Sequence, residues 1–150
     1  MIYNSMNEYA LQSYFKKLCN IYYFAYEQME LSKKAENEAD SIAEDPVKEW
    51  QEIVARKDFW TKEFIRCETR ISEILKVIYE RKFHIIITSR EEVYALISIG
   101  YSSGPRRFRV INTKEEYLRS FPEDEMSKEF LEAYLSEDDE KMIEVINKYY

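Results

Sequence analysis

The sequence predicts an α+β protein in which a long, coiled-coil-like antiparallel helical hairpin precedes a small three-stranded antiparallel sheet and short C-terminal helices. Only 2 Gly and 3 Pro interrupt the 150 residues, which favours long elements. Apolar residues recur at alternating spacings of three and four up to about residue 80, as in paired helices. Beyond that point the apolar runs become rich in β-branched residues, which favour strands. We therefore divide the chain into a helical hairpin, 1–82, and a small α+β module, 83–150, packed on the open end of the hairpin.

The hairpin is predicted from its two apolar seams and from the signals that begin each helix. Ser5 precedes Glu8 by three residues, the spacing of a capping box, so we expect the first helix over 6–43. Pro46 suits the first position of a helix, which places the second helix over 46–82. The turn between the two helices is very short, and therefore they must run antiparallel.

The first helix carries an apolar face near the open end that is wider than one partner helix can bury. Either the C-terminal module or a second copy of the chain must cover this face. Large exposed apolar patches usually mark interfaces, so we expect a homodimer with two-fold symmetry. The residues that we expect to mediate self-association are Tyr14, Phe15, Tyr22 and Tyr26.

The second half of the chain is predicted to begin with a meander of three antiparallel strands. Two β-branched runs flank a short polar segment, which is typical of a β-hairpin. A third alternating run follows the only Gly- and Pro-containing loop. We expect strands at 84–88, 93–99 and 106–111, followed by helices at about 113–121, 123–135 and 137–149.

Composition excludes several classes of function. His84 is the only histidine, whereas zinc sites and di-iron bundles need at least two. Cys19 and Cys67 lack CxxC spacing and are interpreted as core residues of a reduced protein, with a redox pair as the alternative. A net charge of −7 argues against general nucleic-acid coating. We therefore expect no catalytic residues, no metal and no cofactor.

No apolar run reaches the roughly 18 residues of a membrane-spanning helix, and no secretory signal is evident. We accordingly expect no membrane association and a cytoplasmic location, in which both thiols stay reduced.

A basic segment is the most suggestive candidate site. Residues 81–119 carry 8 bases and 4 acids, whereas residues 120–150 carry 10 acids and 3 bases. A Gly-containing loop, Ser hydroxyls and Arg side chains can together hold a phosphate, although the loop is not a P-loop. The alternative is an exposed strand whose arginines pair with the acidic C-terminal helices. The candidate binding residues are Tyr101, Ser102, Ser103, Arg106, Arg107 and Arg109.

The sequence favours two functions over a third, a hydrolase that would use only carboxylates and arginine. The first is a non-enzymatic interaction protein, such as an adaptor, regulator or inhibitor of another protein, of the kind that viruses or mobile elements encode. This hypothesis depends on the missing catalytic equipment, the 13 tyrosines and the projecting hairpin. The second is a protein that binds or sequesters a nucleotide or another phosphorylated ligand through 102–109.

Overall fold

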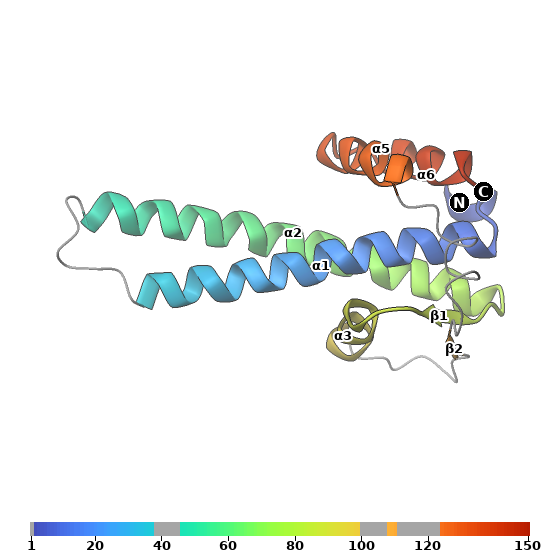
Figure 1. The fold of residues 1–150 in the computed structure, drawn as a ribbon, viewed down its shortest axis with the longest axis horizontal. Coiled ribbons are helices and arrows are strands. Elements are labelled where there is room, and N and C mark those ends of the chain that lie inside the picture. Colours follow the sequence, from blue (N-terminus) through green and yellow to red (C-terminus); the bar gives the residue numbers. More distant parts are fainter. Residues whose placement is uncertain (1, 38–45, 100–107, 111–123) are drawn as a thin grey trace.

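The computed structural model describes residues 2–37, 46–99, 108–110 and 124–150, and it is mostly helical (Figure 1). In chain order its elements are a 3-10 turn η1 (Ile2–Ser5), α1 (Glu8–Asn37), α2 (Pro46–Glu80), β1 (Ile85–Ile87), α3 (Arg90–Ile99), β2 (Phe108–Val110), α5 (Asp124–Leu135) and α6 (Asp139–Lys148).

The predicted long helix pair is confirmed. Helices α1 and α2 run antiparallel, and their far ends project well away from the rest of the chain (Figure 1). Pro46 is the first residue of α2, as expected, because it lacks the N–H that would be unpaired there. The predicted Ser5 cap is wrong, since Ser5 belongs to the 3-10 turn. Asn7 caps α1 instead, and its side-chain oxygen accepts a hydrogen bond from the Ala10 N–H at 2.8 Å.

The hairpin has a well-packed base and a poorly packed distal half. At the base, side chains from both helices are fully buried, among them Leu18 and Ile71. We call residues 24–36 and 47–62 the distal arm. In the arm only Ala25 and Ile53 are buried. The arm therefore has almost no core of its own.

One polar residue in the seam of the arm has a partner across the hairpin. Lys57 interrupts the apolar spacing of α2, and its Nζ lies 2.8 Å from a carboxylate oxygen of Glu36 on α1. An ion pair that is partly open to solvent, as this one is, contributes little to stability. It adds specificity of pairing to the arm but does not replace the missing apolar core.

The predicted antiparallel meander is wrong, because residues 93–99 are helical. They lie in α3, whose first turn follows Ser89. The Ser89 hydroxyl donates to the Glu92 carboxylate three residues later, the spacing of a capping box. Burial of Ala95 and Leu96 on one side of α3 then outweighs the strand preference of its β-branched residues.

The described residues contain two short strands, and these pair in parallel. Ile85, Ile86 and Ile87 of β1 lie opposite Phe108, Arg109 and Val110 of β2. A helix between two strands carries the chain back to the starting end, and so the second strand runs in the same direction as the first. The local unit is thus β–α–β rather than a hairpin.

The elements after the hairpin lie on two opposite sides of its base. Figure 1 shows β1, α3 and β2 on one side of the helix pair, and α5 with α6 on the other. The two termini lie together at the open end, where the Asn7 side chain donates to the Tyr150 carbonyl at 3.2 Å. The C-terminal elements therefore sandwich the base and leave the distal arm uncovered.

Helices α5 and α6 are held to the hairpin by both apolar and charged contacts. The apolar side of α6 faces the core, since Met142 and Ile146 are buried. Asp138 caps α6 by accepting from the Lys141 N–H at 3.1 Å. Asp139 forms an ion pair of 2.6 Å with Arg70 of α2.

Candidate binding surface

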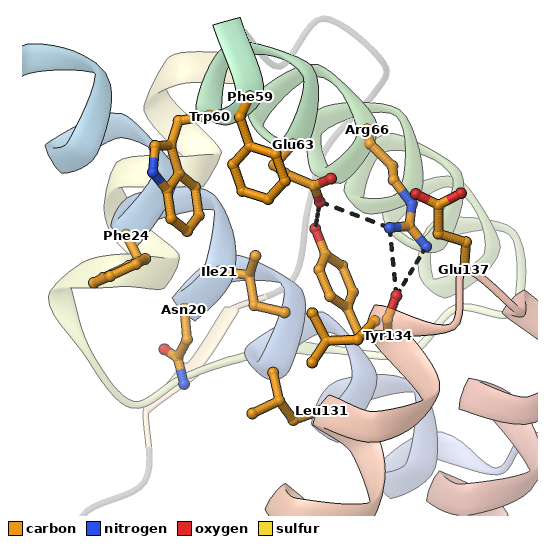
Figure 2. A pocket seen from close by; sticks show the side chains of 11 residues that line it. Asn20, Ile21, Phe24, Phe59, Trp60, Glu63, Arg66, Leu131, Tyr134 and Glu137 are labelled. Atoms are coloured by element: carbon orange, nitrogen blue, oxygen red, sulfur yellow. Dashed lines mark hydrogen bonds and ion pairs between the residues drawn. The ribbon is translucent and has the colours of Figure 1, made fainter. Parts of the chain in front are cut away.

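An open, mostly apolar groove of about 350 Å³ lies where the end of α5 meets the beginning of the distal arm (Figure 2). Three elements that are far apart in the sequence form it. Helix α1 contributes Asn20, Ile21 and Phe24, helix α2 contributes Phe59, Trp60, Glu63 and Arg66, and the C-terminal end of α5 and its following turn contribute Leu131, Tyr134, Leu135 and Glu137.

The polar edge of the groove fastens α5 to α2. The Tyr134 hydroxyl donates to Glu63, and Arg66 forms an ion pair of 3.6 Å with the same carboxylate (Figure 2). Arg66 also donates to the Tyr134 carbonyl at 3.4 Å, and its guanidinium lies 4.5 Å from the centre of the Tyr134 ring. Burial raises the pKa of the Tyr134 hydroxyl well above its usual range, so it stays a donor. These contacts cap the last turn of α5 and fix one wall of the groove.

The opposite wall is aromatic and remains accessible. Phe24 and Trp60 make an edge-to-face contact across the hairpin at 5.1 Å, and Phe59 contacts Trp60 at 5.0 Å. Phe24 is 49% exposed and Phe59 is 52% exposed. Leu131 and Leu135 on α5 are exposed as well. An apolar surface of this extent, rimmed by polar residues, is typical of an interaction site.

The apolar surface continues from the groove toward the tip of the arm. Leu31 is 59% exposed and follows Phe24 by seven residues, two helical turns, so both lie on the same face of α1. The groove and this extension form one strip, which we call the groove face.

The other face of the arm carries a second group of aromatic side chains. Tyr94 of α3 packs against Tyr22, Tyr23 and Tyr26 of α1, with ring centres 5.7, 5.3 and 4.8 Å away. Trp50 is 46% exposed. It lies nine residues from Phe59, which is two and a half turns of helix, and therefore points to the opposite side of α2.

The residues predicted to mediate self-association have different environments in the structure. Tyr14, Phe15 and Tyr22 are fully buried within a single copy of the chain. Phe130 of α5 packs on Tyr14 at 5.8 Å, and α3 covers Tyr22. The C-terminal elements thus cover the wide face, which is one of the two alternatives that the sequence leaves open. Tyr26 alone is half-exposed.

Most of the predicted phosphate site lies outside the described residues. This applies to Tyr101, Ser102, Ser103, Arg106 and Arg107. Arg109 is described only as a backbone position in β2, opposite Ile86. The phosphate site stays a prediction.

The cysteines have the environment of core residues. Cys19 and Cys67 are buried and free. Burial raises the pKa of the Cys67 thiol to about 11 and that of Cys19 well above its ordinary value. His84 is exposed at the start of β1. Neither thiol has the environment of a nucleophile.

Three further observations bear on function. Among residues 2–37, 46–99, 108–110 and 124–150, no group of three or more His, Cys, Asp or Glu side chains is placed to hold a metal ion. In the same part of the chain, no helix combines the length and apolarity needed to cross a membrane. Comparison with protein-family models, with curated proteins and with solved structures finds no match to this chain.

Proposed function

We propose that the protein is a non-enzymatic interaction protein whose distal arm binds another polypeptide. The observation that carries this proposal is the contrast within the hairpin. The base buries most of its apolar side chains within the chain, whereas the arm buries only two and exposes Phe24, Leu31, Trp50 and Phe59. Isolated helix pairs gain most of their stability from packing, so an arm with two buried side chains gains stability when a partner covers it.

The kinds of side chain on the arm support binding to protein. Interface hot spots are enriched in Trp, Tyr and Arg. The arm presents Trp50 and Tyr26 on the α3 side and Trp60 in the groove, and Arg56 is exposed beside the groove face. A partner chain that lies along the arm would desolvate these side chains, which supplies binding free energy in proportion to the apolar area removed from water.

A capture experiment with matched variants tests the proposal. The immobilised protein is used to isolate a partner, which is then purified and titrated against each variant by calorimetry. We expect Trp50→Ser with Tyr26→Ser, or Phe24→Ser with Phe59→Ser, to weaken binding at least tenfold. Tyr79→Ser is the control, because Tyr79 is 43% exposed but lies at the base of α2. A partner that binds all three variants equally would show that the arm is not the binding surface.

The phosphate-binding alternative is tested separately, because its residues belong to a different segment. A thermal-shift screen with nucleotides is sufficient, since a ligand at a hundredfold excess over Kd stabilises the folded state by about 2.7 kcal/mol. A rise in Tm that Arg107→Ala abolishes would establish the alternative, and an unchanged Tm across the panel would reject it.

A further inference from the structure

We infer that the groove between α5 and the start of the distal arm binds a small organic cation, an ammonium group that carries alkyl or aromatic substituents. The inference goes beyond the proposed function, because the ligand occupies the groove itself and needs no partner polypeptide in order to bind. Three properties of the groove carry it: its volume, the aromatic rings of its walls and the sign of the charge left in it.

The volume of the groove suits a small molecule. The groove measures about 350 Å³. Small-molecule sites span roughly 300–1,000 Å³, and an apolar cavity of about 150 Å³ already holds benzene. Ile21, Leu131 and Leu135 add aliphatic surface beside the aromatic rings. A ligand with a ring or a short alkyl body removes this surface from water, whereas a compact inorganic ion does not.

The aromatic rings of the wall supply surfaces that attract a cation (Figure 2). Phe24 and Phe59 each contact Trp60 edge to face, at interplanar angles of 79° and 83°. A contact of this kind covers at most one face of one ring, whereas stacking covers a face of both. Since Phe24 and Phe59 are also half-exposed, ring surface remains open to a ligand. The face of an aromatic ring attracts cations within about 6 Å, and Trp does so most strongly.

The polar edge of the groove already holds one cation against a ring. The Arg66 guanidinium lies 4.5 Å from the centre of the Tyr134 ring. It donates to the Tyr134 carbonyl through two nitrogens and forms an ion pair with Glu63. Arg66 thus holds α5 in place, and its charge is balanced by a neighbouring carboxylate. It therefore offers little attraction to an anionic ligand.

The charge that remains in the groove is negative. Two carboxylates, Glu63 and Glu137, and one guanidinium, Arg66, line it. One oxygen of Glu63 accepts from the Tyr134 hydroxyl and lies nearest to Arg66, and the other forms no hydrogen bond with the described residues. Glu137 is exposed at the rim and forms no ion pair within the described part of the chain. The groove therefore favours a ligand that carries positive charge.

The placement of Glu137 strengthens this bias. Its φ is 60°, the left-handed region that favours glycine, at the position after α5 where glycine is common. Backbone strain of this kind is often stored at ligand sites. The wall to which Glu137 belongs is acidic as a whole, because residues 124–150 contain nine acidic and three basic residues. An acidic wall beside a low-dielectric groove raises the local concentration of cations.

Fluorescence of Trp60 reports binding at the groove itself. Trp50→Phe leaves Trp60 as the only tryptophan of the chain, and Trp60 lines the groove. The probes are para-(trimethylammonio)benzyl alcohol and para-tert-butylbenzyl alcohol, which has the same shape but carbon in place of the charged nitrogen. We expect the cation to change Trp60 fluorescence saturably and to bind at least tenfold more tightly than its uncharged isostere, as a cation–π contact next to a carboxylate implies.

Reversal of one charge at the rim tests the electrostatic part. Glu137→Lys should weaken binding of the cation at least fivefold and change binding of the isostere less than about twofold. Glu80→Lys is the matched control. It changes the net charge equally, but Glu80 is an exposed residue of α2 roughly 30 Å from Trp60 at ~1.5 Å per residue, beyond the range of screened charges. Equal weakening by the two substitutions would show only a general attraction to the acidic chain, and would overturn the inference.

Removal of the rings tests the aromatic part. Phe24→Leu with Phe59→Leu keeps apolar surface but removes two rings, and should weaken binding of the cation about tenfold and that of the isostere less than about threefold. Tyr79→Leu is the control, because Tyr79 is an exposed aromatic residue at the base of α2. Circular dichroism checks that each variant stays folded. Glu137→Lys, which replaces an exposed side chain, remains decisive if the double variant does not fold.

Two results would overturn the inference outright. One is the absence of a saturable change in Trp60 fluorescence with the cation, and the other is equal affinity for the cation and its isostere. Either result leaves the proposed function standing, because capture and calorimetry measure partner binding independently. A chain that binds the cation but binds no polypeptide through its arm would overturn the proposed function alone.

Discussion

The side chain of Gln12 supplies the sharpest test of how the β–α–β unit is attached to the hairpin. Gln12 lies on α1 and is 1% exposed. Its amide nitrogen donates to the carbonyl of His84, and its amide oxygen accepts from the Ile86 N–H at 3.0 Å. The side chain thus pairs with β1 much as a neighbouring strand would, on the edge that β2 does not occupy.

We expect Gln12→Leu to lower the free energy of unfolding by about 2–3 kcal/mol. Leu has a similar volume, so the loss is mainly that of the two hydrogen bonds. The Ile86 N–H is buried and is left unpaired, at a cost of about 1–3 kcal/mol. His84 is exposed, and water can replace Gln12 at its carbonyl at little cost. For a chain of this size, Tm should fall by roughly 4–12 °C.

Thermal unfolding followed by circular dichroism measures this loss, at one protein concentration because self-association would shift Tm. Gln51→Leu is the control, since Gln51 is an exposed residue of α2 that forms no side-chain hydrogen bond with the described residues. It should change the free energy of unfolding by less than about 0.5 kcal/mol. If Gln12→Leu were as stable as Gln51→Leu, the Gln12 side chain would not hold β1 to the hairpin.

Three further predictions follow from single side chains. Tyr14→Phe should leave stability unchanged or raise it slightly in thermal unfolding, because the Tyr14 hydroxyl is buried and has no hydrogen-bond partner among the described residues. Tyr22→Phe loses a 2.8 Å hydrogen bond to Ser98 and should cost about 1 kcal/mol, and equal effects of the two substitutions would contradict this. Cys19 and Cys67 should react with a thiol reagent at pH 8 only after unfolding, because burial raises the pKa of both thiols. Rapid labelling of the native protein would contradict the burial of these two side chains. Hydrogen bonds from the Tyr149 hydroxyl and from Lys148 lower the pKa of the Glu129 carboxyl. Ionised Glu129 therefore stabilises the fold above the ordinary carboxyl pKa, and this stabilisation is lost as the pH falls through the lowered pKa. Glu129→Gln should remove that part of the acid dependence of Tm, and a dependence of Tm on pH that the substitution leaves unchanged would argue against the contact.

The sequence predicts the hairpin correctly because its signals are local. The seam spacing, the absence of Gly and Pro within the helices and Pro46 at the start of α2 all lie within the elements that they specify. The same is true of α5 and α6, which begin and end close to the expected positions.

The wrong prediction of a strand at 93–99, which is helical in the structure, has an identifiable cause. The β-branched residues in this segment favour a strand, but Ser89 and Glu92 have the spacing of a capping box, and the Ser89 hydroxyl donates to the Glu92 carboxylate at the start of the helix. Glu92 is fully buried, and its carboxylate accepts from the Thr88 hydroxyl at 2.7 Å and lies 3.8 Å from Lys16. Partners on another element therefore decide the conformation, which local propensity cannot anticipate.

The groove was not predictable, because its walls come from residues that lie up to about 115 positions apart. Phe24 and Leu131 look like ordinary helix-face residues in the sequence. Only the placement of α5 across the base shows that these side chains remain uncovered while Tyr14 and Tyr22 are buried. The sequence predicts the wide aromatic face of the first helix, but it does not predict that α3 and α5 cover that face.

Hydrogen exchange, read by mass spectrometry at low protein concentration, tests the central claim that the distal arm lacks a core of its own. We predict slow exchange for backbone amides at the base, over 10–22 and 67–78, and exchange at least a hundredfold faster over 24–36 and 47–62. Protection of the arm should rise when a second copy or another bound partner covers it. If the arm were as protected as the base in the isolated monomer, the arm would be complete without a partner, and the claim would be contradicted.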